Sequence, residues 1–454
     1  MENRPDRETN LAAHAAKTQR LIAALHERSA GAIRLAKDTS NLFRERKPPA
    51  GSDLQVRDFN KVLYVSPPEG FAEVEGMTPY VNLTRECLKF GVMPTVVPQL
   101  KSITIGGAAT GIGIEASSFQ YGLVHETIQA MDILLGDGTI VTCTPENEHR
   151  RLFYGFANSY GTLGYALKLK IKIVPVKPYV RLTHIRYQDA TSCFAAVADY
   201  CRHDIDFIDG VIFGPGEYYL TLGKFADTAP YTSDYTYKKI YYRSIRERGT
   251  DYMTVEDYIW RWDTDWFWCS GYLFAQNPFV RRLLGPEHLN SMTYTKIMRW
   301  NRKYNLMHYF DRLRGLNSEA VIQDVEIPLE RCADFLNFYF ENIRFTPVWM
   351  CPVQPFDPKA RFPLYPLNPD TLYVNFGFWN VIKTRGKVTP GHHNRMVEQK
   401  VRELGGMKSL YSDAYYSPEE FWQIYDREEY LYLKKLYDRK GLLQDLYAKC
   451  VSRE

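Results

Sequence analysis

The sequence predicts a multidomain protein of the α+β class, and three observations support this prediction. The chain has 454 residues, enough for two or three domains with a sizeable core. Apolar residues make up 45% and charged residues 24%, as in ordinary soluble globular proteins. Helical and strand-like patterns are mixed along the chain, and Pro175 and Pro178 mark a boundary beyond which Tyr and Trp become frequent.

The elements before this boundary follow from periodicity and turn residues. Apolar residues recur at helical spacing over 9–28, and strands are expected at 32–36, 61–65 and 71–75. A helix is expected over 80–90, where Gly91 closes it. The turn Gly136-Asp137-Gly138 predicts a β-hairpin after a helix over 123–131. A helix near 152–156 and a long strand over 165–174 complete the first part.

Beyond the boundary, long strand patterns and helix patterns alternate, and the C-terminal part has a different pattern. From Gly405 onward, a Gly-Gly turn precedes a strand-like LYSDAYY and two charged helices. The sequence therefore predicts three parts, covering residues 1–177, 178–404 and 405–454.

Charge and cysteine usage exclude several functional classes. The net charge is only +4 and there is no basic tail, so we expect no nucleic acid partner. The eight cysteines form no C-x-x-C pair, so we expect no metal and reduced cytosolic thiols. No apolar run approaches the ~20 residues of a transmembrane helix. We expect a cytoplasmic protein, either soluble or peripheral on the inner face of the membrane, and the sequence predicts no particular oligomeric state.

Residues 104–122 read TIGGAATGIGIEASSFQYG and hold five glycines. The pattern G-x-G-x-x-A at 111–116 is similar to a dinucleotide-binding turn, but no helix is expected to open at its third position. Small residues also let main-chain amides in a loop approach an anion without a helix. A pyrophosphate cofactor is then the natural ligand, and a tight turn without a ligand is the alternative.

Several motifs resemble the vanillyl-alcohol-oxidase (PCMH-type) FAD family. PQLKSITIGG at 98–107 with GIGIE at 111–115 resembles its flavin-binding segment, and SYGTLG at 159–164 resembles its later flavin-contact loop. Residues 37–41 lie where the family has its first phosphate loop. The resemblance implies a two-subdomain FAD-binding domain at 1–177, an α+β substrate (cap) domain at 178–404, and a C-terminal segment that returns to the flavin.

The resemblance assigns specific residues to FAD. They are Lys37, Asp38, Thr39, Ser40, Asn41, Pro98, Thr104, Ile105, Gly106, Gly107, Thr110, Gly111, Gly113, Ile114, Glu115, Ser117, Ser118, Gly122, Gly161, Leu163, Gly164 and Ile173. Members that bind flavin covalently carry a histidine in the first loop, where Thr39 and Ser40 stand here. The resemblance therefore implies noncovalent FAD.

The second half resembles the delta-24-sterol reductase family in VIQD (321–324), PVWMCP (347–352) and LYSDAY (410–415). YIWRWDTDWFWC (258–269) and KKIYYR (238–243) are similar to a bacterial branch that acts on branched fatty acyl chains. This implies reduction of a branched or methylene-substituted acyl, or sterol-like, C=C bond, with NADPH as a candidate donor. One alternative is desaturation of a methylated chain on the route to furan fatty acids. A second is a flavin-free lipid-binding protein.

Such a reduction needs a proton donor and a wall that tolerates positive charge, which aromatic faces provide. Asp413 is a candidate acid, because Tyr411, Asp413 and Tyr415 share one face of an extended strand. Tyr411 is an equal candidate, and Asp413 could instead accept hydrogen bonds at a turn. Asp263 and Asp265, between two Trp pairs, are further candidates, with a packed aromatic corner and solvent-facing carboxylates as the alternative.

Residues 278–304 combine basic and apolar side chains. Arg281, Arg282, Lys296 and Arg299 interleave with Phe279, Leu283 and Trp300, and Glu287 is the one acidic residue. This composition suits an interfacial helix on an anionic bilayer, with a helix packed on its own domain as the alternative.

Overall fold

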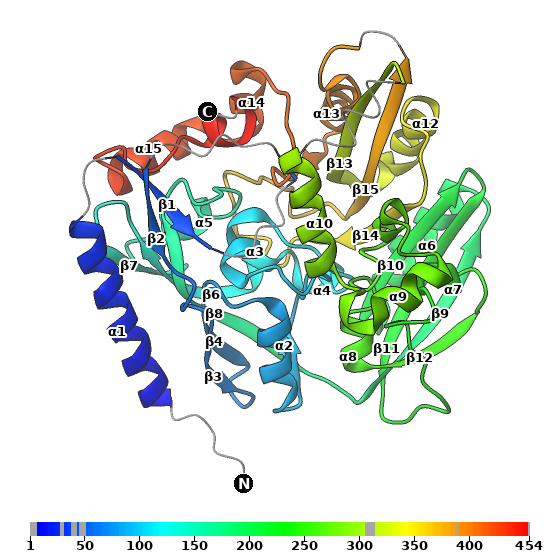
Figure 1. The fold of residues 1–454 in the computed structure, drawn as a ribbon, viewed down its shortest axis with the longest axis horizontal. Helices are drawn as coiled ribbons and strands as arrows, with labels where there is room; N and C mark the ends of the chain where they lie inside the picture. The colour runs from blue at the N-terminus through cyan, green and yellow to red at the C-terminus, as the bar shows by residue number, and fades with distance from the viewer. Residues whose placement is uncertain are drawn as a thin grey trace.

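Two antiparallel sheets lie side by side and form the frame of the molecule (Figure 1). The computed structural model describes residues 7–27, 31–37, 43–44, 51–304, 314–385 and 388–452. One sheet uses strands from 62–175 and the other uses strands from 179–408, so the chain changes sheet beside Pro175 and Pro178. The α+β prediction is confirmed.

The first sheet has the strand order β3-β4-β8-β6-β7, with β5 also paired to β8. Its elements are α1 (Arg7–His26), β1 (Ala32–Ala36), β2 (Gly51–Gln55), β3 (Val62–Ser66), β4 (Phe71–Glu75), α2 (Tyr80–Leu88), β5 (Val92–Pro94), α3 (Ile105–Gly111), α4 (Ser118–Tyr121), a 3-10 helix (Val124–Thr127), β6 (Ile128–Leu134), β7 (Ile140–Cys143), α5 (Arg150–Gly155) and β8 (Tyr165–Pro175). Strands β1 and β2 form a separate parallel pair. Helix α1 is fixed to the sheet by the fully buried Glu75, which pairs with His14 and Lys17.

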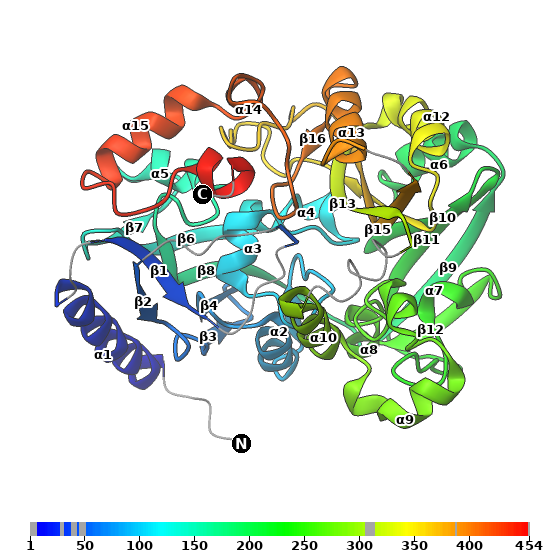
Figure 2. The same cartoon turned by 45° about the horizontal axis from the view of Figure 1, so that its top comes forward.

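The second sheet has the order β12-β9-β11-β10-β14-β15-β13-β16. Its elements are β9 (Tyr179–Tyr187), α6 (Ala190–Tyr200), β10 (Phe207–Gly214), β11 (Glu217–Ala226), α7 (Tyr241–Ser244), β12 (Thr250–Thr254), α8 (Val255–Ile259), a 3-10 helix (Cys269–Leu273), α9 (Pro278–His288), α10 (Ser291–Tyr304), β13 (Leu316–Pro328), a 3-10 helix (Leu329–Arg331), α12 (Cys332–Asn342), β14 (Val348–Val353), β15 (Tyr373–Arg385), α13 (His392–Glu403) and β16 (Met407–Lys408). Helices α6, α12 and α13 cover one face of this sheet (Figure 2).

The two faces of the second sheet differ sharply because strand side chains alternate. On β13, Val321, Val325 and Ile327 enter the apolar core beneath the helices. Asp324 and Glu326 take the intervening positions and therefore lie on the opposite face. On β14, Trp349 lies on that opposite face, because it joins the core that is continuous with the first sheet. Polar and aromatic groups of the second sheet are thus turned toward the first.

The C-terminal helices are α14 (Pro418–Ile424) and α15 (Arg427–Tyr437). Helix α15 returns to the first sheet and lies beside α5 (Figure 1), while α14 is joined to α13 by the Arg395–Glu420 ion pair. Arg151 of α5 forms an ion pair with Glu429 of α15, and the Ile33 amide donates to the Leu442 carbonyl at 2.9 Å. A short π-helical turn, Ala448–Ser452, ends the described chain. Within the described ranges, no helix is both long and apolar enough to cross a bilayer.

Most elements expected from the sequence are confirmed, and three expectations are wrong. The helix expected over 123–131 is a single 3-10 turn followed by β6, because Ile128 onward pairs with β8. The glycine-rich stretch is not an open loop, since it forms α3 and α4. The LYSDAYY segment is not a strand, although its burial alternates as in an extended chain.

Helix α3 packs so closely on the turn after β4 that a side chain at Gly106 has no room. An added Cβ would lie 2.6 Å from the Gly76 carbonyl oxygen, a main-chain atom that cannot swing away. We expect Gly106→Ala to lower the free energy of unfolding by about 1–3 kcal/mol, measured by chemical denaturation. At Gly249, where an added Cβ meets nothing within 4 Å, the same change serves as the control. Equal stability of the two variants would contradict this packing argument.

Candidate flavin and substrate site

Segments far apart in the sequence meet where the two sheets face each other. The Tyr160 hydroxyl donates to the Gly111 carbonyl at 3.0 Å, joining the SYGTLG loop to the glycine-rich stretch. The Phe43 amide donates to the Tyr411 carbonyl at 3.0 Å, joining the C-terminal segment to the residues that follow the first loop. The structure therefore brings together the described parts of the predicted flavin-contacting segments.

The glycines near 107 serve close packing inside the protein. The amide of Ile105 donates to Thr78 at 3.0 Å, and that of Gly106 donates to Gly76 at 2.9 Å. The Gly107 amide donates to the Thr104 hydroxyl, which caps α3. These three donors thus have acceptors within the chain, which departs from the expectation of amides left open in a loop. At Gly111, an added Cβ would lie 3.2 Å from the Tyr160 ring.

Two other buried groups in these segments have unused donors. Arg44 is 1% exposed, and its Nε and Nη2 atoms have no hydrogen-bond partner. Ser412, also 1% exposed, has no partner for its hydroxyl and pairs through its backbone with Phe43. FAD has phosphate oxygens and ring carbonyls that accept such hydrogen bonds. The donor set therefore fits FAD, which Arg44, Ser412 and the SYGTLG loop would hold.

The other residues predicted to bind FAD occupy the first domain, and several use their polar groups internally. The Ser117 hydroxyl donates to the Thr95 carbonyl, and the Ser118 hydroxyl accepts from the Glu115 amide. Pro98, Thr110, Gly113, Ile114, Gly122, Gly161, Leu163, Gly164 and Ile173 lie in α3, β8 and the neighbouring turns. Lys37 follows β1, whereas Asp38, Thr39, Ser40 and Asn41 lie outside the described residues. The assignment of these residues to FAD stays a prediction.

Glu115 takes part in a buried ion cluster. Its Oε1 atom lies 3.1 Å from Nη2 of Arg261, and the same nitrogen lies 2.7 Å from Asp209. Burial raises the pKa of Glu115 to about 7, although the Arg261 charge lowers it. Arg261 itself is 3% exposed, so it is a buried cation and not part of the surface charge.

Asp324 and Glu326 are the carboxyl groups on the inward face of β13. Burial raises the pKa of Asp324 to about 6, while hydrogen bonds from Tyr411 and Asn375 lower it. Burial also raises the pKa of Glu326 to about 8, and the Tyr365 hydroxyl donates to this carboxyl. Within the described ranges, neither group forms an ion pair with a cation. Sequence reasoning quoted Asp324 in the VIQD motif but did not select it as a site residue.

An aromatic wall stands beside Asp324. We define it as Phe43, Trp266, Phe267, Trp268, Trp379 and Tyr411. The Trp379 indole donates to the Tyr411 hydroxyl at 2.8 Å, and the Phe267 and Trp379 ring centroids are 4.4 Å apart. An added Cβ at Gly377 would lie 2.6 Å from the Asp324 carboxylate. The glycine therefore leaves room for this carboxylate beside the wall. The wall therefore offers ring faces next to a carboxyl group.

The tryptophan-rich block reverses direction so that its rings reach this wall. Trp266 and Phe267 have φ angles of 45° and 59°, a left-handed conformation that is costly for bulky side chains. Turn residues extend over 260–268, so Asp263 and Asp265 lie within this reversal. Such strain is typical of functional sites.

Asp263 and Asp265 are buried and fully engaged, in contrast to the solvent-facing alternative. Asp263 accepts from the Ser291 hydroxyl and from the Lys101 amide at 2.8 Å. Asp265 pairs with Arg281 and accepts from Ser270 at 2.8 Å. These contacts hold α9 and α10 against the block, so the geometry favours a positioning role for both carboxylates.

Asp413 and Tyr415 lie farther along the C-terminal segment. Half-buried residues at 411, 413 and 415 alternate with buried ones, but the segment is not a strand, so the expectation that they share one face stays a prediction. Lys408, buried against Glu398, donates to the Asp413 carbonyl at 2.7 Å. The Tyr415 amide donates to Glu398 at 3.1 Å, which ties this tyrosine to α13. Their catalytic roles stay predictions.

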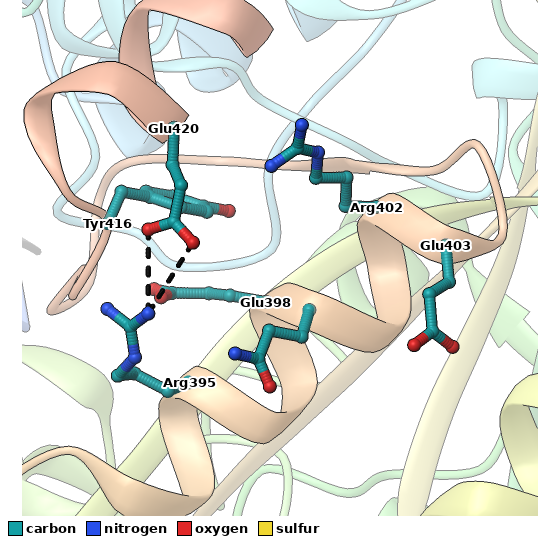
Figure 3. A pocket seen from close by; sticks show the side chains of 7 residues that line it. Arg395, Glu398, Arg402, Glu403, Tyr416 and Glu420 are labelled. Atoms are coloured by element: carbon teal, nitrogen blue, oxygen red, sulfur yellow. Dashed lines mark hydrogen bonds and ion pairs between the residues drawn. The ribbon is translucent and has the colours of Figure 1, made fainter.

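A surface pocket of about 370 Å³ lies between α13 and the start of α14 (Figure 3). It is lined by Arg395, Glu398, Gln399, Arg402, Glu403, Tyr416 and Glu420. The figure shows Arg395 turned toward Glu420, whose carboxylate lies 3.5 Å away. Charges of both signs line this pocket, which makes it unsuitable for an acyl chain. Among the described residues, no cluster of side chains could hold a metal ion.

The comparison with known families supports FAD as the ligand, in agreement with the unused hydrogen-bond donors of Arg44 and Ser412. The model of the FAD binding domain family matches residues 11–144, which covers α1 to β7. The chain is therefore an FAD-dependent protein with a PCMH-type domain, and the flavin-free lipid-binding alternative is set aside.

Similarity to characterised proteins extends beyond this domain. The chain is 27% identical to Delta(24)-sterol reductase of Homo sapiens over 409 residues, covering 86% of this chain and 75% of that protein. It is 25% identical to Delta(24)-sterol reductase of Pisum sativum, covering 88% of this chain and 76% of that protein. Cytokinin dehydrogenase 1 of Arabidopsis thaliana is 26% identical over 31% of this chain and 25% of its own. These findings support an FAD-dependent oxidoreductase, and the chain is similar to the delta(24)-sterol reductases over most of its length.

The first loop carries Thr39 in place of a histidine, and we expect the flavin to be bound without a covalent bond. Acid precipitation should release FAD into the supernatant and leave a colourless pellet. The measurement is the flavin absorbance of both fractions. Flavin that stays on the polypeptide after denaturing electrophoresis would contradict this expectation.

Proposed function

We propose that the protein is an FAD-dependent enzyme that reduces a carbon–carbon double bond of a branched lipid, with Asp324 as the proton donor. The observation that carries this proposal is the half-buried carboxyl group of Asp324, which lies beside an aromatic wall and has no cationic partner in the described chain. The delta(24)-sterol reductase relatives support a reaction at a CH–CH bond. The apolar wall supports a fatty acyl or sterol-like substrate.

An isolated alkene has no carbonyl group to accept the charge of an added hydride. Protonation first is the favourable route, because a branched alkene then gives a tertiary carbocation. Asp324 in its neutral form donates the proton, and the carboxylate left behind attracts the developing positive charge. The faces of Trp379 and Phe267 add cation–π attraction, worth about 2 kcal/mol when desolvated. Bound FAD in its reduced form supplies the hydride.

Tyr411 and Asn375 hold the carboxyl group in place. Asn375 donates from Nδ2 to Oδ1 of Asp324 at 3.2 Å, and the Tyr411 hydroxyl hydrogen-bonds to the same group. Tyr411 is in turn fixed by the Trp379 indole. Because the pKa of Tyr411 lies well above its usual value, its phenol stays neutral and keeps this arrangement over the working pH range.

The reverse reaction is the second candidate, and one observation favours it. With a pKa of about 6, Asp324 is mainly ionised at neutral pH and is then a base. A base in this position would take a proton from a methyl-branched saturated chain while FAD accepts the hydride. This would make the protein a desaturase of the kind used to build furan fatty acids.

The direction of the pH dependence distinguishes the two candidates. For reduction, Asp324 must be protonated, so the rate should be high below pH 6 and fall as pH rises through about 6. For desaturation, the carboxylate is needed and the rate should rise over the same interval. Asp324→Asn should lower either rate by about 10²–10⁴-fold. Single-turnover kinetics under anaerobic conditions measure both rates.

Two further variants test the assignment. In the wild type, the hydrogen bond from Tyr411 lowers the pKa of Asp324. Tyr411→Phe removes this bond, so the pKa of Asp324 and the pH transition should both move upward. Asp413→Asn is the matched control and should keep most activity. Loss of activity in Asp413→Asn with normal activity in Asp324→Asn would contradict the proposal. Anaerobic NADPH should bleach the flavin of a reductase, and a persistent yellow colour favours the desaturase.

We propose further that the enzyme reaches its lipid at an anionic membrane surface, on the cytoplasmic face. The docking surface consists of Phe274, Phe279, Arg282, Leu283, Lys296, Ile297, Met298, Arg299 and Trp300. Phe274, Phe279 and Leu283 have exposed fractions of 76%, 70% and 72%, which is unusual for large apolar side chains. In α10, residues 296–300 are all exposed, and Trp300 is 57% exposed.

Charge selects an anionic bilayer as the occupant of this surface. Exposed Arg282, Lys296 and Arg299 accompany the apolar side chains, against the single acidic Glu287. Apolar anchors with basic neighbours are typical of interfacial helices, and each basic residue near an anionic surface contributes about 1 kcal/mol. Arg281 is a correction to the expected basic set, because it is 4% exposed and pairs with Asp265.

Flotation with liposomes checks this proposal. The protein should float with vesicles that contain anionic lipid and much less with neutral vesicles. Phe279→Ser with Leu283→Ser should abolish flotation, since each buried side chain contributes about 1.5–3 kcal/mol. Leu431→Ser is the control, because Leu431 of α15 is also exposed, at 44%, but lies outside the docking surface. Flotation that is the same for the double variant and the wild type would overturn the proposal.

A further inference from the structure

Arg44 is a cation buried at a junction of three segments. It is 1% exposed and follows the segment that the sequence assigns to phosphate binding. Its Nη1 atom donates to the Leu410 carbonyl and, at 3.0 Å, to the Cys450 sulfur. Its guanidinium carbon lies 4.6 Å from the centre of the Tyr160 ring. Arg44 therefore touches the SYGTLG loop, the C-terminal segment and the last turn of the described chain.

These contacts leave the charge of Arg44 uncompensated. A guanidinium has five N–H donors, and the Nε and Nη2 donors of Arg44 have no acceptor. No carboxylate forms an ion pair with Arg44 in the ranges that the structure describes. Moving a charge out of water is strongly unfavourable unless an opposite charge replaces the water, so buried arginines almost always have an anionic partner.

A second cationic side chain contacts the same loop as Arg44. Lys449 donates from Nζ to the Tyr160 carbonyl at 2.7 Å, on the same loop that Arg44 contacts. The Tyr160 ring joins Arg44 to the glycine-rich stretch, because its hydroxyl donates to Gly111. An anion that enters between these segments would meet unused donors and two cationic side chains.

We propose that Arg44 forms a buried anion-binding site and that its ligand is a negatively charged group of FAD itself. Two groups have this chemistry: the diphosphate, and the isoalloxazine ring when reduction makes it anionic. Both accept hydrogen bonds from a guanidinium. The inference rests on FAD binding and does not depend on which lipid reaction the enzyme catalyses.

The test compares full-length wild type with Arg44→Met and Arg44→Lys, with and without flavin. For Arg44→Met, we expect an FAD dissociation constant raised at least about 30-fold, measured from the quenching of FAD fluorescence. The apo form of this variant should melt at the same or a higher temperature than apo wild type, because an unpaired buried charge is removed. Arg44→Lys should recover part of the affinity. Arg20→Met, at an exposed arginine of α1, is the control.

Riboflavin and ADP identify which group of FAD contacts Arg44. If it is the diphosphate, Arg44→Met should weaken FAD and ADP and leave riboflavin binding and the flavin reduction potential unchanged. If it is the reduced ring, the variant should lower the reduction potential and bind ADP normally. Unchanged FAD affinity and potential, together with a less stable apo protein, would overturn the proposal and make Arg44 a packing residue. This result would leave the Asp324 chemistry untouched, so the two proposals fail separately.

Discussion

The arrangement of the site depends on one buried cation, Arg261. Its guanidinium joins Glu115 of the glycine-rich stretch to Asp209 of β10 in the cap sheet. The indoles of Trp262 and Trp349 also donate to Asp209, at 3.2 and 3.3 Å. Loss of Arg261 would leave two carboxyl groups buried without a cation, which is strongly unfavourable. The cluster therefore fixes the tryptophan-rich block over the flavin domain.

This fixed block connects the substrate site to the proposed membrane contact. Trp266 and Phe267 belong to the aromatic wall, while Asp263 and Asp265 on the same turns hold the first residues of α10 and α9. Tyr294 of α10 stacks on Trp266 with ring centroids 6.3 Å apart. A lipid that leaves a bilayer at α9 and α10 would thus meet the aromatic wall within one rigid unit.

Elements with a local sequence signal could be predicted from the sequence. The roles of residues whose partners lie far away in the sequence could not. The hairpin at 136–138 follows from neighbouring residues, since its turn and both strands are adjacent in the sequence. Arg261 could not be placed, because Glu115 and Asp209 lie 146 and 52 positions away. Asp324 and Glu326 did leave a signal, since two acids at a spacing of two in an apolar strand must share one face. The sequence could not show that Trp379 of β15 and Tyr411 of the C-terminal segment lie beside these acids, so the signal alone did not identify a site.

Compensation of buried charge separates structural groups from reactive ones in this fold. Asp265, Arg281 and Lys408 are buried and each forms an ion pair, while Asp263 accepts hydrogen bonds from Ser291 and the Lys101 amide, so these groups hold the chain in place. Arg44 is buried and Asp324 is half-buried, and neither meets an opposite charge in the described chain. Such groups persist where a ligand or a reaction supplies what the protein does not. Both lie beside the C-terminal segment, one against the Tyr411 side chain and the other against the Leu410 carbonyl. A bound flavin that passes this segment would place its own charge and its redox chemistry between an unmatched cation and an unmatched acid.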